Sequence, residues 1–130
     1  MANNRLKAAD IAKMKYVSLA TFRKSGVAVE TAVWIAEHNG TLYLYSEGHV
    51  GKVKRIRANG KARLAECDLR GKVLGEFVEA SGRLVEDETE REHAFAALKA
   101  KYGWQMGLAN MLSRIFGKYS KRVVIAIELT

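Results

Sequence analysis

Proline is absent from the chain and cysteine occurs once, so neither residue type can organise the fold. The 11 glycines must make the turns, which favours hairpins closed by glycine over rigid proline corners. Cys67 has no second cysteine to pair with, which excludes an internal disulfide and fits a reducing cytoplasm. The three histidines, His38, His49 and His93, are scattered along the chain, and this argues against a metal site.

Long apolar runs are also missing. No window of about 18 apolar residues occurs, so we expect no membrane-spanning helix. The first ten residues lack the apolar core of a secretory signal. The 130 residues, 48 % of them hydrophobic and 28 % charged, are typical of a soluble globular protein. We therefore predict one cytoplasmic domain that spans residues 1–130.

Positive charges outnumber negative ones, because the chain has 22 Lys and Arg residues and 14 Asp and Glu residues, which give a net charge of +8. This balance favours an anionic ligand, whether a nucleic acid, a nucleotide or a polycarboxylate.

Periodic patterns predict a mainly β (α+β) fold. Alternating apolar and polar residues predict six strands, at 16–23, 27–36, 41–46, 61–69, 72–85 and 122–129. Helical patterns occupy 5–13, 49–58, 87–101 and, more loosely, 103–117. Tight turns at Lys24–Gly26, Asn39–Gly40 and Arg70–Gly71 join consecutive strands, and no β-α-β rhythm appears. Six antiparallel strands of this length predict a small β-barrel with peripheral helices.

The strand–turn–helix stretch 42–57, LYLYSEGHVGKVKRIR, is the best candidate for a ligand site. Ser46 can donate a hydrogen bond, and Lys52 can reach back from the first turn of a basic helix. The N–H groups of that turn lack intrahelical partners and suit an anion. Charge-assisted hydrogen bonds of this kind contribute about 1.5–3 kcal/mol each. The alternative is a solvated basic helix with its apolar residues on the core.

Catalytic motifs are not found. The chain has no Gly-x-Ser-x-Gly elbow, no Rossmann glycine pattern and no Walker loop. The carboxylates of 87–92 are typical of a helix N-terminus. We assign no catalytic residue, and this favours a bound redox cofactor that carries the chemistry if the protein is an enzyme.

A family resemblance is carried by the runs YVSLATFRKSG, TAVWIA and LYLYSEGHVGKVKRIRANGKARLAECDLRGK. They resemble the pyridoxamine 5'-phosphate oxidase-like superfamily, and in particular its branch of flavin- or deazaflavin-dependent (coenzyme F-420) enzymes. The similarity covers roughly residues 6–129 and is strongest over 16–72. It implies a split β-barrel, a homodimer with cofactor sites at the subunit interface, and FMN or coenzyme F-420 as the cofactor.

The resemblance also implies roles for single residues. Two residues match the positions that hold the cofactor phosphate, and two cations lie beside them: Ser46, Lys52, Lys54 and Arg55. Four residues match the strand whose backbone borders the cofactor ring: Thr31, Ala32, Val33 and Trp34. Tyr45 matches a position near the ribityl chain. For Trp34, simple core packing is the alternative.

Three positions depart from the family pattern. Ala32 and Gly60 replace prolines that are common in relatives, at the ring-binding strand and at the helix exit. Val50 stands where a serine is common, which removes one possible phosphate ligand.

The leading hypothesis is an oxidoreductase that passes a hydride to or from a small planar substrate. The net charge of +8 favours the anionic tail of coenzyme F-420 without excluding FMN. A non-enzymatic flavin or haem carrier would need the same pocket. A basic barrel that binds single-stranded nucleic acid through Tyr43 or Tyr45 is a further alternative, although aromatic residues alternating with leucine are more typical of core strands. We expect residues 103–119 to cover the barrel or a dimer interface and not to lie on a membrane, and residues 102–118 to contact the substrate.

Overall fold

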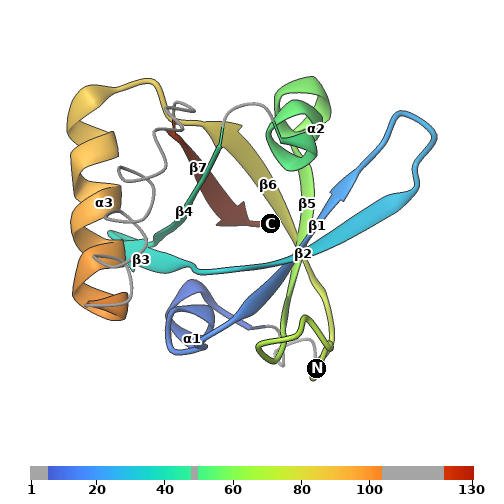
Figure 1. The fold of residues 1–130 in the computed structure, drawn as a ribbon, viewed down its shortest axis with the longest axis horizontal. Coiled ribbons are helices and arrows are strands. Elements are labelled where there is room, and N and C mark those ends of the chain that lie inside the picture. The colour runs from blue at the N-terminus through green and yellow to red at the C-terminus, as the bar shows by residue number, and fades with distance from the viewer. Residues whose placement is uncertain (1–5, 48–49, 104–121) are drawn as a thin grey trace, which may run out of the picture.

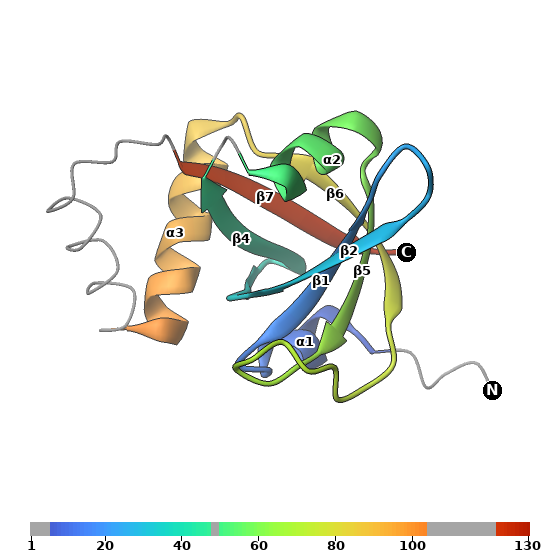
Figure 2. The same ribbon diagram turned by 45° about the vertical axis from the view of Figure 1, so that its right-hand side comes forward.

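The computed structural model describes residues 6–47, 50–103 and 122–130 (Figure 1). In chain order its elements are α1 (Ala8–Ala12), β1 (Val17–Phe22), β2 (Ala28–Val33), β3 (Ala36–His38), β4 (Thr41–Glu47), α2 (Gly51–Asn59), β5 (Lys61–Glu66), β6 (Val78–Leu84), α3 (Glu88–Tyr102) and β7 (Arg122–Leu129). The strands form one antiparallel sheet with the order β2-β1-β5-β6-β7-β4-β3. This sheet curls into a half-barrel, with α2 over one end, α1 near the other and α3 along the side of β3 and β4 (Figures 1 and 2). The predicted mainly β split barrel is thereby confirmed.

The number of strands is seven among the described residues, not the predicted six. The predicted strand 27–36 is two strands, because β2 pairs with β1 whereas β3 pairs with β4 at the other edge of the sheet. Between them the chain leaves the ladder at Trp34 and Ile35. This bend carries the chain from one edge of the curled sheet to the other.

The predicted strands 61–69 and 72–85 are both too long. Strand β5 ends at Glu66 and β6 begins only at Val78. The chain turns at Asp68, whose side chain accepts hydrogen bonds from the N–H groups of Arg70 (2.9 Å) and Lys72 (2.8 Å). These local bonds draw the backbone away from the sheet, so that a single bridge between Cys67 and Val73 remains beyond β5.

Turn and cap predictions are confirmed where glycine and asparagine mark them. Asn39 and Gly40 both have positive φ, 53° and 85°, as a tight hairpin between β3 and β4 requires. Gly60 ends α2 in the left-handed conformation with φ 71°. The Asp87 side chain accepts a hydrogen bond from the Glu90 N–H (2.8 Å) at the start of α3, as its spacing predicts.

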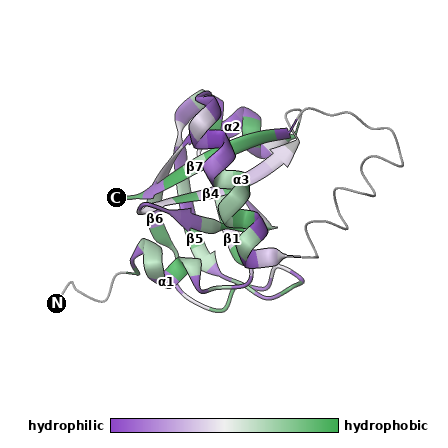
Figure 3. Cartoon of the chain, turned by 90° about the vertical axis from the view of Figure 1, so that its left-hand side faces the viewer, coloured by the Kyte–Doolittle hydropathy of each residue, from purple (hydrophilic) through white to green (hydrophobic). Residues whose placement is uncertain are grey.

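The main core fills the curled sheet. Its largest fully buried side chains include Leu19, Leu44, Leu64, Ile125 and Ile127. Helix α2 adds Val53 and Ile56 to this core and exposes Lys54 and Arg57, which agrees with its mixed colours in Figure 3. Cys67 is buried, and burial raises the pKa of its thiol, as expected of a small core residue.

Helix α3 is held to the sheet by an ion pair and a hydrogen bond. The Nη1 and Nη2 atoms of Arg83 on β6 donate to the Glu90 carboxylate, at 3.0 and 2.7 Å. The Tyr43 hydroxyl on β4 donates to the same carboxylate at 2.7 Å. Glu90 therefore joins α3 to β4 and β6.

Of the helices in the described residues, none combines the length and hydrophobicity that a membrane span needs. Residues 104–117 of the predicted fourth helix lie outside the described residues, as does most of the segment expected to contact the substrate.

Candidate functional site

Ser46 and Lys52 lie on the two sides of one short connection. Ser46 is near the end of β4, where it pairs with Val123 of β7 and is only 8 % exposed. Lys52 is the second residue of α2 and is half-buried. Residues 48 and 49 between them lie outside the described residues. Ser46, with the predicted hydroxyl, thus lies at the end of the strand before this connection. Lys52, with the predicted ammonium group, lies at the start of the helix after it.

The first turn of α2 provides backbone donors. Its N-cap residue is Val50, in an extended conformation, and no side chain caps this end of the helix in the part of the chain that is described. A serine at this position could have occupied one of these N–H groups. The uncapped N–H groups and the positive end of the helix dipole suit an anion.

Arg55 adds a cation to the same end of α2. Its Nε donates a hydrogen bond at 2.7 Å to the hydroxyl of Thr21, a fully buried residue of β1. Its guanidinium reaches back over Gly51, because a Cβ added there would lie 2.6 Å from the Arg55 Nη1. Glycine at residue 51 therefore leaves the space that the guanidinium fills. Lys54, the other predicted cation, is exposed on the same helix.

The predicted ring-binding residues lie on β2 and just after it. Thr31 is half-buried, Ala32 is exposed and Val33 is 9 % exposed. Strand β2 ends the strand order on one side, so its outer edge has no partner strand among the described residues. The backbone groups of this edge remain available for hydrogen bonds.

The side chain of Trp34 packs against α3. Its ring stacks on the Tyr102 ring, with centroids 4.7 Å apart and an angle of 9° between the planes. This contact supports the packing alternative for the Trp34 side chain.

The end of α3 fixes the bend after β2, and sequence analysis did not identify the residues that do so. The Tyr102 hydroxyl accepts from the Ile35 N–H at 3.0 Å and lies 2.9 Å from the Lys15 carbonyl. The Lys101 Nζ donates to the carbonyls of Met14 and Ile35, at 2.6 Å each. Burial raises the pKa of Tyr102 to about 12 and lowers the pKa of Lys101 to about 8.

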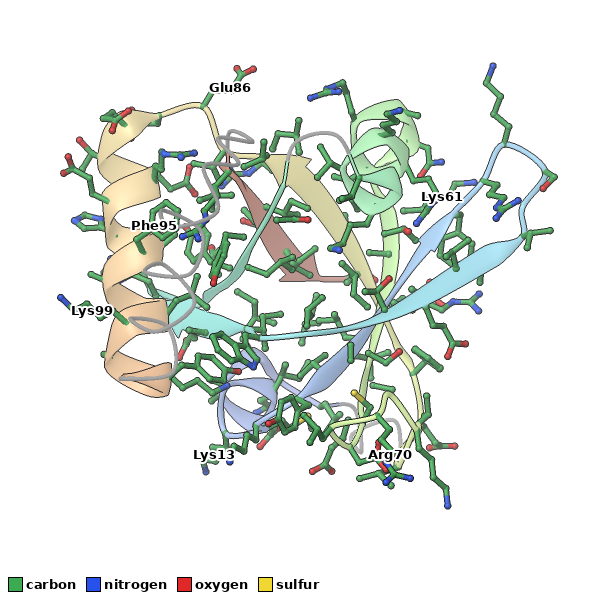
Figure 4. All side chains as sticks on the ribbon, in the orientation of Figure 1. Lys13, Lys61, Arg70, Glu86, Phe95 and Lys99 are labelled. Atoms are coloured by element: carbon green, nitrogen blue, oxygen red, sulfur yellow. The ribbon has the colours of Figure 1, made fainter. Side chains whose placement is uncertain are left out.

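Tyr45, the predicted ribityl neighbour, packs among α3, β4 and β7. Its ring centroid lies 5.7 Å from that of Phe95, which Figure 4 labels on α3, and the Arg122 guanidinium carbon lies 5.1 Å from it. Tyr45, which directly precedes Ser46 on β4, therefore belongs to a hydrophobic cluster that joins α3 to the sheet.

The histidines are partly brought together. His38 on β3 and His93 on α3 have ring centroids 4.5 Å apart, whereas His49 lies outside the described residues. Within the described ranges, no group of three or more His, Cys, Asp or Glu side chains is arranged to hold a metal ion.

The chain is similar to a known protein family and to several solved structures. A family model described as pyridoxamine 5'-phosphate oxidase matches residues 5–129. A conserved hypothetical protein from Mycobacterium tuberculosis aligns with a TM-score of 0.67 and 18 % identity, over 99 % of this chain and 87 % of its own. An F420 reductase aligns with a TM-score of 0.60 and 20 % identity, over 97 % of this chain and 94 % of its own. The haem storage protein of Vibrio cholerae aligns with a TM-score of 0.66 and 10 % identity, over 91 % and 83 %. At these identities the likeness to each structure concerns the fold alone. No curated protein matches the chain.

Proposed function

Because the chain belongs to the pyridoxamine 5'-phosphate oxidase family, we propose that it binds FMN or coenzyme F-420 and acts as an oxidoreductase. In this proposal it passes a hydride to or from a small planar substrate. The observation that carries the proposal is the group of cations and uncapped N–H groups at the N-terminal end of α2.

This end of the helix fits a cofactor phosphate. Ser46 supplies a hydroxyl, Lys52 an ammonium group and Arg55 a guanidinium, and the first turn of α2 supplies N–H groups without a side-chain cap. Charge-assisted hydrogen bonds contribute about 1.5–3 kcal/mol each, and the helix dipole adds about 0.3–1 kcal/mol. Two such bonds contribute about 3–6 kcal/mol, so contacts with the rest of the cofactor must supply the remainder of the about 8.2 kcal/mol to which a micromolar dissociation constant corresponds.

The open edge of β2 fits the polar rim of the ring. Residues 31–33 lie on this edge, which has no partner strand in the described part of the chain, and the bonds from Tyr102 and Lys101 hold the chain where β2 ends. A bound flavin or deazaflavin supplies the hydride chemistry itself. The residues of this chain bind and orient the ring, which agrees with the lack of a catalytic motif.

Composition and surface support three finer points of the proposal. The net charge of +8 favours coenzyme F-420, whose tail is anionic. Leu69 and Leu74 are 71 % and 57 % exposed, on the loop whose Gly71 lies beside the Ala32 methyl group. A second copy of the chain would cover this apolar surface in a homodimer with cofactor sites at the interface.

The single, buried Cys67 is consistent with a cytoplasmic location.

Titration of FMN and of coenzyme F-420, followed by absorbance and fluorescence, tests the phosphate assignment. We expect Lys52→Ala to weaken binding about 10- to 100-fold, which corresponds to a loss of about 1.4–2.8 kcal/mol. Lys99→Ala, at an exposed position on α3, is the control and should bind as the wild type does. Equal affinity of Lys52→Ala and the control for both cofactors would remove the assignment.

A second variant tests the position of Arg55. In Gly51→Ala the new methyl group would displace the guanidinium, because the two would be 2.6 Å apart. We expect weaker cofactor binding with an unchanged circular dichroism spectrum.

A non-enzymatic carrier is the second candidate. The fold likeness to a haem storage protein and the lack of a catalytic motif both agree with it. Turnover of reduced cofactor with planar acceptors distinguishes the two candidates, since a carrier would bind the cofactor without oxidising it catalytically.

A further inference from the structure

A groove of about 450 Å³ lies at the C-terminal end of α2, between the β1–β2 hairpin and the start of β5. Figure 4 shows Lys61 in this region, beside α2 and the hairpin. Its lining includes Phe22, Arg23, Lys24, Asn59, Lys61 and Arg63. Helix α2 has nine residues and rises about 1.5 Å per residue, so the groove is separated from the candidate cofactor site by about 13 Å of helix.

Uncompensated positive charge is the main property of the groove. Arg23, Lys24 and Lys61 are exposed, and their side chains make no ion pair or hydrogen bond with any described residue. The one carboxylate in the lining, Glu79, is paired with Arg63 at 2.6 Å. Three cationic residues without an ion-pair partner among the described residues therefore line one small space, which favours an anion with several charges.

The floor of the groove is held in place by the protein itself. The Asn59 amide donates to the Phe22 carbonyl at 3.0 Å, and its oxygen accepts from the Lys61 N–H at 2.8 Å. The Arg63 guanidinium, fixed by Glu79, lies 5.3 Å from the Phe22 ring centroid. Because α2, β1 and β5 are joined by these contacts, the groove needs little rearrangement to receive a ligand.

We propose that this groove binds the diphosphate group of a small ligand, at a site separate from the cofactor site. Lysine and arginine both bind phosphate, lysine as a point charge and arginine through two parallel hydrogen bonds. The volume exceeds that of inorganic pyrophosphate and leaves room for a nucleoside attached to it, within the usual range for small-molecule sites.

Isothermal titration with pyrophosphate, ADP and adenosine tests the proposal. We expect the two diphosphates to bind at low ionic strength and adenosine not to bind. The Arg23→Ala/Lys61→Ala double variant should bind pyrophosphate about 100-fold more weakly, at about tenfold for each charge removed. Lys13→Ala/Lys99→Ala, which removes two exposed charges elsewhere, should bind as the wild type does. Tighter binding of ADP than of pyrophosphate would indicate a nucleotide, and equal binding the inorganic anion; both support a diphosphate site.

Several results would overturn the proposal. One is the absence of pyrophosphate binding to the wild type at millimolar concentration, and another is equal weakening in the two double variants. If Lys52→Ala weakens pyrophosphate binding as much as the groove variant does, the anion binds at the other end of α2. If a single-stranded oligonucleotide binds through Arg23 and Lys61 while pyrophosphate does not, the surface is a nucleic-acid site.

The two proposals fail independently. FMN and F-420 affinity should be unchanged in the groove variant, and pyrophosphate affinity should be unchanged in Lys52→Ala. Circular dichroism of each variant shows whether it has folded, and the exposure of Arg23 and Lys61 predicts that it has.

Discussion

Tyr102→Phe should destabilise the protein by removing one oxygen atom. The Tyr102 hydroxyl is the acceptor for the N–H of Ile35, a residue with no exposed surface, and it lies within hydrogen-bond distance of the Lys15 carbonyl. Phenylalanine keeps the ring that stacks on Trp34. The substitution therefore isolates the hydrogen bonds from the packing.

The expected cost is about 1–3 kcal/mol, because a buried N–H group is left without its acceptor. The Tyr102 hydroxyl also lies 3.2 Å from the Ile35 carbonyl, and the loss of this contact costs less because Lys101 still donates to that carbonyl at 2.6 Å. For a domain of this size, the loss corresponds to a decrease in melting temperature of roughly 3–15 °C.

Urea unfolding at one fixed protein concentration, followed by circular dichroism, measures the change in free energy. Tyr16→Phe is the matched control, because the Tyr16 hydroxyl makes no hydrogen bond with any described residue. A free energy of unfolding for Tyr102→Phe within about 0.5 kcal/mol of the control would refute the role given to the bend, since that is the usual size of a neutral surface change.

Two further predictions concern the sheet and α3. The hydrogen bonds from Arg83, the larger cause, and from Tyr43 lower the pKa of Glu90 from its usual 4.5 to about 2, so its stabilising effect is complete above pH 4.5 and is lost as the pH falls towards 2. The difference in unfolding free energy between wild type and Glu90→Gln should shrink over that range, and a constant difference would contradict the assignment. Gly82→Ala should cost about 1–3 kcal/mol in thermal or urea unfolding, because its Cβ would lie 2.9 and 3.0 Å from two buried isoleucine methyl groups. Gly75→Ala, where the added methyl group meets open space, should be close to neutral.

Local signals in the sequence predicted the elements that local physics determines. Asn39–Gly40 and Gly60 need positive φ, and the spacing of Asp87 and Glu90 caps a helix, so the turn, the helix end and the helix start were all found. The basic helix at 49–58 was placed within two residues of α2.

Features that depend on tertiary pairing were not predicted. Residues 27–36 alternate like one strand, and only the competing partners β1 and β4 divide them. The predicted strand 72–85 starts too early, because the Asp68 side chain accepts hydrogen bonds from N–H groups of its own turn. Nothing in the helical pattern of 87–101 selects Ile35 as the partner of Tyr102, 67 residues away in the sequence. The groove proposed to bind a diphosphate was likewise not predicted, because it gathers residues from three separate segments of the chain.

The position of β7 has a consequence for the order in which the protein assembles. The last strand of the described chain inserts between β6 and β4, in the interior of the sheet and not at an edge. While a ribosome is still synthesising residues 122–129, β4 and β6 each lack a neighbour, and their open edges can pair with other chains. We therefore expect the barrel to complete itself only after translation of β7, and premature termination before residue 122 to yield aggregates in place of a shortened barrel.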